Sequence, residues 1–252
     1  MDKFFSIYYS GEPFQIFSRV HIVSLSIILI IILLIYFNAE RLRKSRVDRF
    51  ARNFIATGLI ATELSFQLWC GIKGVWTVEY NLPFHLCTIS TIICAIMLYK
   101  NSYKIYRLAY FWGLGGAIPA LLTPDLSGYG YPHYVFFKFF ILHGLIIIAV
   151  VYMTFVYKYR LDIKSVFRAF AYINIFALVV VPVDIITGGN YLFLCRKPDA
   201  ITPLDYLGPW PWYIIPMELV VLAMFFAFYL PFAIKDHVDR YKSAGSGLSS
   251  GL

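Results

Sequence analysis

The sequence predicts an all-α polytopic membrane protein, a bundle of seven transmembrane helices in one domain. Hydrophobic residues make up 60% of the 252 residues and charged residues only 14%, which is far from the balance of a soluble domain. The apolar residues also gather in runs of about 20, the helical length that crosses a hydrocarbon core of roughly 30 Å. Residues 1–242 are therefore expected to form the membrane domain. Residues 243–252, SAGSGLSSGL, are expected to be a flexible linker or tag remnant.

Seven apolar runs follow one another along the chain. The first lacks a small-residue cleavage site and is followed by charged residues, so we expect a retained helix and not a signal peptide. Basic links at 40–52, 100–107 and 158–168 mark the starts of the second, fourth and sixth helices. Pro83 suits the first turn of the third, the loop TPDLSGYGYPH precedes the fifth, and the aromatic segment LGPWPWY leads into the seventh. The predicted helices are Val20–Phe37, Asn53–Gly71, Leu82–Tyr99, Ile105–Leu122, Tyr134–Val156, Arg168–Ile186 and Trp212–Ile234.

The Lys and Arg residues predict the orientation. Sixteen of the 22 fall in the three basic links and the C-terminal segment, whereas five lie in the opposite loops and Lys138 lies within the fifth helix. Because cytoplasmic loops carry the excess of Lys and Arg, we expect the N-terminus outside and the C-terminus in the cytoplasm. The net charge of +8 is then a topology signal that also favours anionic lipid. No nucleic-acid partner is expected.

Most ionisable side chains within the predicted helices fall in the outer half of the bundle. Such groups are costly in a bilayer and usually face a bundle interior or a water-filled cavity, so they predict a polar cavity that opens outwards. The alternative is that they form interhelical pairs, for example Lys138 with Glu218 or Asp184. The residues in question are the ionisable Glu63, His85, Cys87, Lys138, His143, Asp184 and Glu218, together with the polar Gln67.

Cys87 is the candidate nucleophile. One turn into a helix that starts near Pro83, its thiol would feel the positive helix N-terminus, which favours the thiolate needed for acyl transfer. The alternative is a small buried hydrophobe. His85 is a poor base because residues two apart on a helix do not face each other. The base is then His143, roughly 14 Å deep against about 6 Å for Cys87, or His133 in the outer loop, and depth alone does not choose between them.

The four cysteines give no metal motif, because they lack paired CxxC spacing. Three His ligands for zinc, from His85, His133 and His143, would require a coincidence of depths. We therefore expect no metal and no cofactor. Cys70 and Cys195 both lie near the outer face, where they either form a disulfide or remain free.

Several segments resemble the YwaF-type integral membrane family. They are LPFHLC (82–87), GLGGAIPALLTPD (113–125), the histidines at 133 and 143, and the segments NYLFL and LGPWPWY within 190–213. The resemblance covers the chain up to its Gly/Ser tail and implies a multi-pass protein of the bacterial plasma membrane. The family is similar to an animal transmembrane phospholipid acyltransferase and, more distantly, to androgen-induced membrane hydrolases that use a Thr and a His. Carried over, the resemblance implies that Cys87 is the nucleophile and His143 its partner.

Two functions from different classes fit these observations. The first is a lipid acyltransferase or acyl hydrolase with a membrane-lipid or fatty-acyl substrate, in which Asn190, Ser90 or the amides at a helix start supply a hydrogen bond to the oxyanion. Glu63, Gln67, Asp184 or Glu218 would orient the His or bind a head group. The second is a non-enzymatic transporter or ligand-binding protein that uses the carboxylates and Lys138. The lipid substrate, the acyl acceptor and the oligomeric state are left open.

Overall fold

The computed structural model of the chain describes residues 3–197 and 203–249, and within these ranges it is helical, with no strand. Eight α-helices and two short 3-10 helices follow one another. They are α1 (Arg19–Phe37), α2 (Ala39–Leu42), α3 (Ser45–Ile72), α4 (Leu86–Lys100), α5 (Tyr103–Leu122), α6 (Tyr134–Phe155), α7 (Ile163–Thr187), η1 (Tyr191–Phe193), η2 (Pro203–Leu207) and α8 (Ile214–Ser249).

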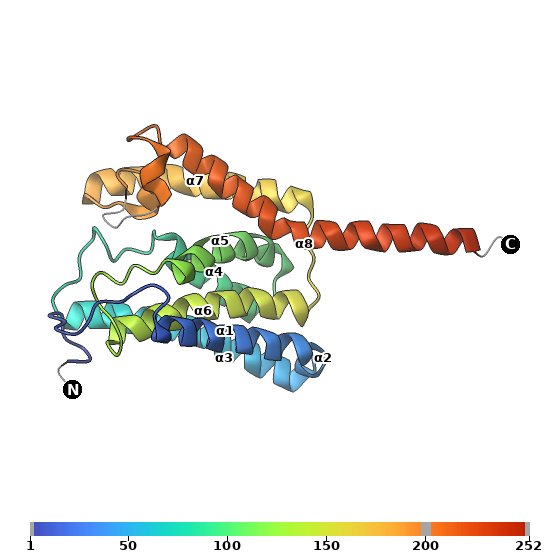
Figure 1. Cartoon of the computed structure of the whole chain (residues 1–252), viewed down its shortest axis with the longest axis horizontal. Coiled ribbons are helices and arrows are strands. Elements are labelled where there is room, and N and C mark those ends of the chain that lie inside the picture. Colours follow the sequence, from blue (N-terminus) through green and yellow to red (C-terminus); the bar gives the residue numbers. More distant parts are fainter. Residues whose placement is uncertain (1–2, 198–202, 250–252) are drawn as a thin grey trace.

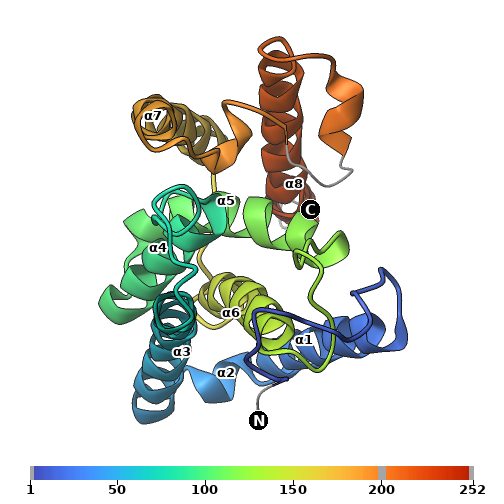
Figure 2. The same cartoon turned by 90° about the vertical axis from the view of Figure 1, so that its left-hand side faces the viewer.

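The helices pack around α5 and α6. Helix α6 contacts α1, α3, α4 and α5, and helix α5 contacts α4, α6, α7 and α8. Helices α7 and α8 form a hairpin on the side of α5 away from α1 and α3 (Figure 2). The N-terminal segment and the links 73–85, 123–133 and 188–213 lie at one end, called the loop end here, and α2 and the link 156–162 lie at the other, the basic end (Figure 1). The chain therefore has one broad surface of loops and one of short basic links.

Six of the described helices are long and apolar enough to cross a membrane: α1, α3, α5, α6, α7 and α8. The predicted helix Leu82–Tyr99 differs most, because α4 begins only at Leu86 and has 15 residues, about 22 Å at 1.5 Å per residue. The Leu82 N–H donates to the Tyr191 hydroxyl (3.0 Å) and the Phe84 N–H to the Leu82 carbonyl (2.8 Å). These bonds hold residues 82–84 in a tight turn, so helix α4 starts late.

Three other boundaries differ from the sequence prediction, and one of them is the start of α7, which lies at Ile163 and not at the predicted Arg168. The link 40–52 is helical from Ser45 onward, because Asp48 and Arg52, four residues apart on one helical face, form a buried ion pair. Helix α8 continues past the predicted end at Ile234 to Ser249, so its helical backbone enters the Gly/Ser tail. Residues 250–252 of that tail lie outside the described residues.

A polar network joins α3, α4 and α6 at the basic end. Asp48 accepts hydrogen bonds from Arg52 Nε (3.0 Å), Tyr152 (3.0 Å) and Tyr157 (2.6 Å). Arg52 in turn donates to the Leu98 carbonyl of α4 (2.5 Å). Burial and the bond to Asp48 raise the pKa of Tyr157 to about 12, so its hydroxyl stays a donor. The network fixes the relative height of the three helices.

The C-terminal ends of α4 and α6, which also lie at the basic end, are joined as well. Asn101, the C-cap of α4, accepts hydrogen bonds from the Tyr159 hydroxyl through its side-chain oxygen (3.1 Å) and its carbonyl (3.2 Å). Tyr159 lies just beyond the last residue of α6. Helices α4 and α6 thus run in the same direction and end at the same level.

Removing Asp48 should destabilise the protein strongly. In an Asp48→Ala variant the buried Arg52 guanidinium loses its counter-ion, which costs about 3–5 kcal/mol for buried pairs. Asp236→Ala is the matched control, because the Arg160–Asp236 pair is half-exposed and such pairs contribute about 0–1 kcal/mol. Thermal unfolding in detergent, followed by tryptophan fluorescence, measures both. Equal losses for the two variants would contradict the structural role of the network.

Candidate functional site

Cys87 lies in the first turn of α4 and faces the glycine-rich stretch of α5. A Cβ atom placed on Gly116 would lie 3.2 Å from the Cys87 sulfur and 3.4 Å from Leu86, which is tight for a carbon contact. The thiol therefore occupies space that exists because residue 116 is a glycine. Cys87 is half-buried there, and it is a free thiol, as are Cys70, Cys94 and Cys195.

His143 lies in the middle of α6 with its tautomer fixed by the backbone. Its Nδ1 is 2.7 Å from the Phe139 carbonyl, and since a carbonyl only accepts, Nδ1 carries the proton. In the neutral ring Nε2 then keeps its lone pair. Across the described residues no protein atom hydrogen-bonds to this Nε2. The ring is buried, 6% exposed, and its Nε2 is left with a lone pair that no described residue occupies.

The heights of Cys87 and His143 can be compared through the glycines of α5. A Cβ atom on Gly113 would be 3.0 Å from Ile146 Cγ2, 3.4 Å from Val150 Cγ2 and 3.6 Å from the Cys94 sulfur, so Cys94 of α4 and both side chains of α6 lie against this glycine. Cys87 precedes Cys94 by seven residues, and His143 precedes Val150 by seven. Seven residues are two helical turns, about 10 Å, and return to the same face.

Two turns back from this packing point, Cys87 and His143 lie within about one helical turn of each other in height. Counted from the C-terminal ends of the two helices, Cys87 lies 13 residues before Lys100 and His143 lies 12 residues before Phe155, so the difference in depth predicted from the sequence becomes small. Among the histidines left open by the sequence, His143 is the one whose height on the bundle matches the thiol.

A buried ion pair stands beside this site. Lys138 Nζ lies 3.6 Å from Glu63 Oε2, and Glu63 Oε1 accepts from Gln67 Nε2 (2.9 Å). The ion pair acts electrostatically on both Cys87 and His85. The partner of Lys138 is thus Glu63 of α3. The pairs with Glu218 or Asp184, considered from the sequence, are not formed.

The loops at the loop end tie the remaining polar residues to α4. Gln67 donates to the Asn81 carbonyl (3.1 Å), and the Tyr191 hydroxyl donates to the Val78 carbonyl (2.7 Å). The ring of Tyr191 packs edge-on against His85, with centroids 4.7 Å apart. Asp184 accepts from the Tyr191 N–H (2.8 Å), so it contacts the site only through Tyr191.

Three predicted site residues have other partners. Both ring nitrogens of His133 bond to the backbone, Nε2 to the Ser6 carbonyl (2.8 Å) and Nδ1 to the Val135 N–H (3.2 Å), and burial lowers its pKa. Asn190 bonds within its own loop, to the backbone of residues 195 and 196. Glu218 accepts from Asn174 of α7 (2.9 Å). His133 therefore caps α6 and has no nitrogen free for proton transfer.

Most of the chain matches a known protein family. Residues 16–229, which include all eight candidate residues in the helices and both loop residues, match the TMEM164 family. The chain belongs to the TMEM164 family. No curated protein and no solved structure matches it. Membership in this transmembrane family agrees with the six long apolar helices, and the chain is a multi-pass integral membrane protein.

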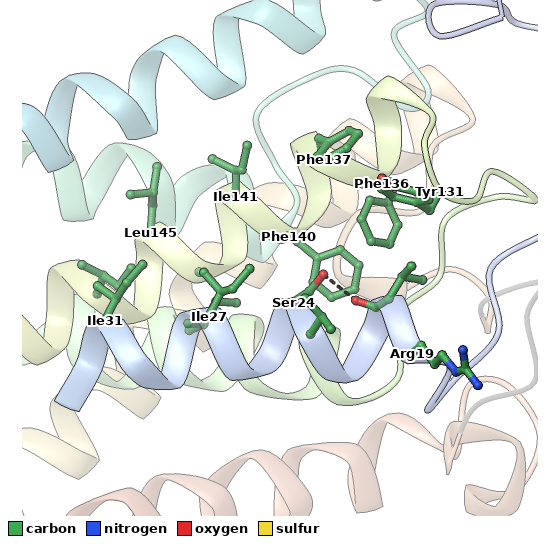
Figure 3. A pocket seen from close by; sticks show the side chains of 15 residues that line it. Arg19, Ser24, Ile27, Ile31, Tyr131, Phe136, Phe137, Phe140, Ile141 and Leu145 are labelled. Carbon is green, nitrogen blue, oxygen red and sulfur yellow. Dashed lines mark hydrogen bonds between the residues drawn. The ribbon is translucent and has the colours of Figure 1, made fainter. Parts of the chain in front are cut away.

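An apolar groove lies on the α1 side of α6 in this TMEM164-family chain. It has a volume of about 480 Å³ and is lined by side chains such as Ile27, Phe140 and Leu145, with Arg19 at its mouth (Figure 3). Gly144 belongs to its lining, next in sequence to His143 but on another face of α6. The groove is apolar and is distinct from the polar cavity predicted from the sequence, which stays a prediction.

Sequence reasoning missed three residues of the site: Asn81, Gly116 and Tyr191. The glycines in GLGG were a usable signal, since small residues in an apolar helix mark close helix contacts. Nothing in the sequence pairs Tyr191 with the start of α4, because that contact joins segments more than a hundred residues apart. No group of three His, Cys, Asp or Glu in the described part of the chain is arranged to hold a metal ion.

Proposed function

We propose that this TMEM164-family chain is a lipid acyltransferase or acyl hydrolase in which Cys87 is the nucleophile and His143 the base. The observation that supports the proposal is that Cys94 and Val150, each seven residues after Cys87 and His143 respectively, both lie against Gly113 of α5, while His143 Nε2 has no hydrogen-bond partner among the described residues. Nucleophile and base from separate helices, held by packing, are the arrangement that covalent acyl transfer requires.

The reaction proceeds in two balanced steps. His143 Nε2 takes the proton from the Cys87 thiol as the sulfur attacks the carbonyl carbon of a lipid acyl ester. The C–O bond to the alcohol then breaks, the alcohol oxygen takes the proton from His143, and a thioester to Cys87 remains. Water or a second lipid hydroxyl attacks this thioester, His143 takes its proton, and the sulfur leaves and recovers a proton as the thiol.

Two groups near Cys87 can stabilise the oxyanion. No side chain caps the N-terminus of α4, so its first amide N–H groups are free to donate to a bound group. The Ser90 hydroxyl, fully buried one turn along the same helix, has no hydrogen-bond partner in the described structure. Asn190, the other donor considered from the sequence, is fully engaged in its own loop. Ser90 and the helix amides therefore take this role.

A second function is favoured by one specific observation. Glu63 Oε2 is buried and its contact with Lys138, at 3.6 Å, is longer than a hydrogen bond. An ion pair with a spare acceptor is also what a transporter or ligand-binding protein would use to hold a polar ligand. If the chain has this second function, transport or ligand binding depends on Glu63 and Lys138 and is independent of Cys87.

We infer that the chain crosses the membrane seven times. Six of the crossings are the long apolar helices, and the shorter α4 with the turn before it makes the remaining one. The N-terminus then lies outside and the C-terminus in the cytoplasm, and the resemblance to a bacterial family supports the bacterial plasma membrane. The excess of Lys and Arg at the basic end supports this orientation. A reporter that is active only in the cytoplasm, fused after residue 242, should be active, and the same reporter before Lys3 should not. The reverse pattern would contradict the orientation.

Lipid acyl turnover tests the enzymatic proposal. The purified chain is incubated with a phospholipid that carries two different acyl chains, and acyl exchange and fatty-acid release are followed by mass spectrometry. Cys87→Ala should abolish turnover, and His143→Gln should lower it by about 10²–10⁴, the range for loss of a general base. Cys94→Ala, on the same face of α4, is the matched control and should change turnover by less than about twofold.

Full turnover by Cys87→Ala would refute the nucleophile. Turnover that is lost in Glu63→Gln but kept in both Cys87→Ala and His143→Gln would also refute the proposed pair and would favour the ligand-binding function.

A further inference from the structure

A polar pocket lies between the first three turns of α5 and of α7 at the basic end. It has a volume of about 360 Å³, and three cationic side chains line it: Lys104 and Arg107 from α5 and Arg168 from α7. It lies at the opposite end of the bundle from the loops around α4. Nothing in the proposed acyl chemistry uses it.

The pocket has a fixed floor. The Trp112 indole N–H donates to the Ala169 carbonyl (3.0 Å), which joins α5 to α7 one turn beyond the pocket. Ala169 and Leu108 form part of the pocket lining. This hydrogen bond from the Trp112 side chain to the Ala169 backbone therefore helps to fix the shape of the pocket that the three cationic side chains line.

The cations of the pocket lack acidic partners. Other basic residues of the described chain, Arg52, Lys138 and Arg160, each form an ion pair, whereas no described carboxylate lies within ion-pair distance of the three pocket cations. Three cations around one pocket with no carboxylate in contact give it a positive potential that attracts anions.

The acid nearest in the sequence to the α7 cation is already engaged. Asp162 caps α7, where its Oδ1 accepts from the Ser165 N–H (2.9 Å) and hydroxyl (2.5 Å). These hydrogen bonds hold the pKa of Asp162 below its usual value, so it stays ionised. It acts on Arg107 only at longer range. One such carboxylate opposite three cations leaves an excess of positive charge.

We propose that this pocket binds a phosphate group, carried by an anionic lipid headgroup or free in solution. Two guanidinium groups from different helices can each donate hydrogen bonds to phosphate oxygens in a fork geometry, and an ammonium adds a point charge. The Tyr172 side chain also lines the pocket and brings a hydroxyl donor. Basic pockets between transmembrane helices on the cytoplasmic side bind lipid head groups of this kind, and the basic end is where such a leaflet would lie.

Native mass spectrometry of the full chain in detergent tests the proposal. The probes are phosphatidic acid, phosphatidylcholine with the same acyl chains, and inorganic phosphate. The double variant Arg107→Gln/Arg168→Gln should raise the dissociation constant for phosphatidic acid by at least about tenfold, since charge-assisted bonds are lost. Arg41→Gln/Arg49→Gln is the matched control, because it removes two exposed cations from the same end, and it should change the constant by less than about twofold.

The other probes decide the source of the phosphate. Competition by inorganic phosphate shows that the site takes the phosphate group itself, and failure to compete while phosphatidic acid binds shows a lipid headgroup site. Equal binding of phosphatidic acid by both double variants, or equal binding of phosphatidylcholine and phosphatidic acid, would overturn the proposal. If the pocket variant does not fold, Arg168→Gln alone, at an exposed position, takes its place.

Discussion

The close packing of helices against the glycines of α5 is the constraint on which the site depends. A Cβ atom on Gly113 would meet Ile146 at 3.0 Å, one on Gly115 would meet Phe225 at 3.3 Å, and one on Gly116 would meet Cys87 at 3.2 Å. These three contacts lead to α6, α8 and α4 respectively. Small residues let helices approach closely where the apolar lipid gives no hydrophobic drive for association. The position of the thiol follows from this approach.

Two buried ion pairs frame this packing along the bundle axis. Asp48 and Arg52 lie at the basic end, and Glu63 and Lys138 lie towards the loop end. Such pairs gain little net stability because both charges are desolvated, but breaking one is costly, which favours a single register of helices. His143 lies between the two pairs along α6, after Lys138 and before Tyr152, which donates to Asp48. The height of α6 relative to α3 is thus fixed from both ends.

The sequence predicted much of the fold, because its signals are local. Apolar runs, basic links and aromatic segments located all six long helices, and the spacing of Glu63 and Gln67 placed them on one face, where they are hydrogen-bonded. The late start of α4 was not predictable, since it depends on a bond from Leu82 to Tyr191 of a distant loop. The sequence also left His133 and His143 open as the base. The hydrogen bonds that occupy both ring nitrogens of His133 favour His143, and they join segments that no local pattern connects.

The partner of Lys138 illustrates the same limit. Glu63, Asp184 and Glu218 are all carboxylates at comparable predicted depths, so depth did not distinguish them. The packing of α3 against α6, and of α7 with α8 on the far side of α5, brings only Glu63 within reach. Side-chain chemistry proposes the candidates in a membrane bundle, and the order in which helices pack decides which of them meet.

Cross-linking across α4 and α6 tests the central claim, that Cys87 and His143 face each other. In a background with Cys70, Cys94 and Cys195 replaced by Ala, His143→Cys is treated with a short bifunctional thiol reagent, and the intact mass is measured. The account predicts a single bridge between residues 87 and 143, and little bridging for Gly144→Cys, whose position faces Ile28 of α1. Bridging that is absent at 143, or equal at 143 and 144, would contradict it.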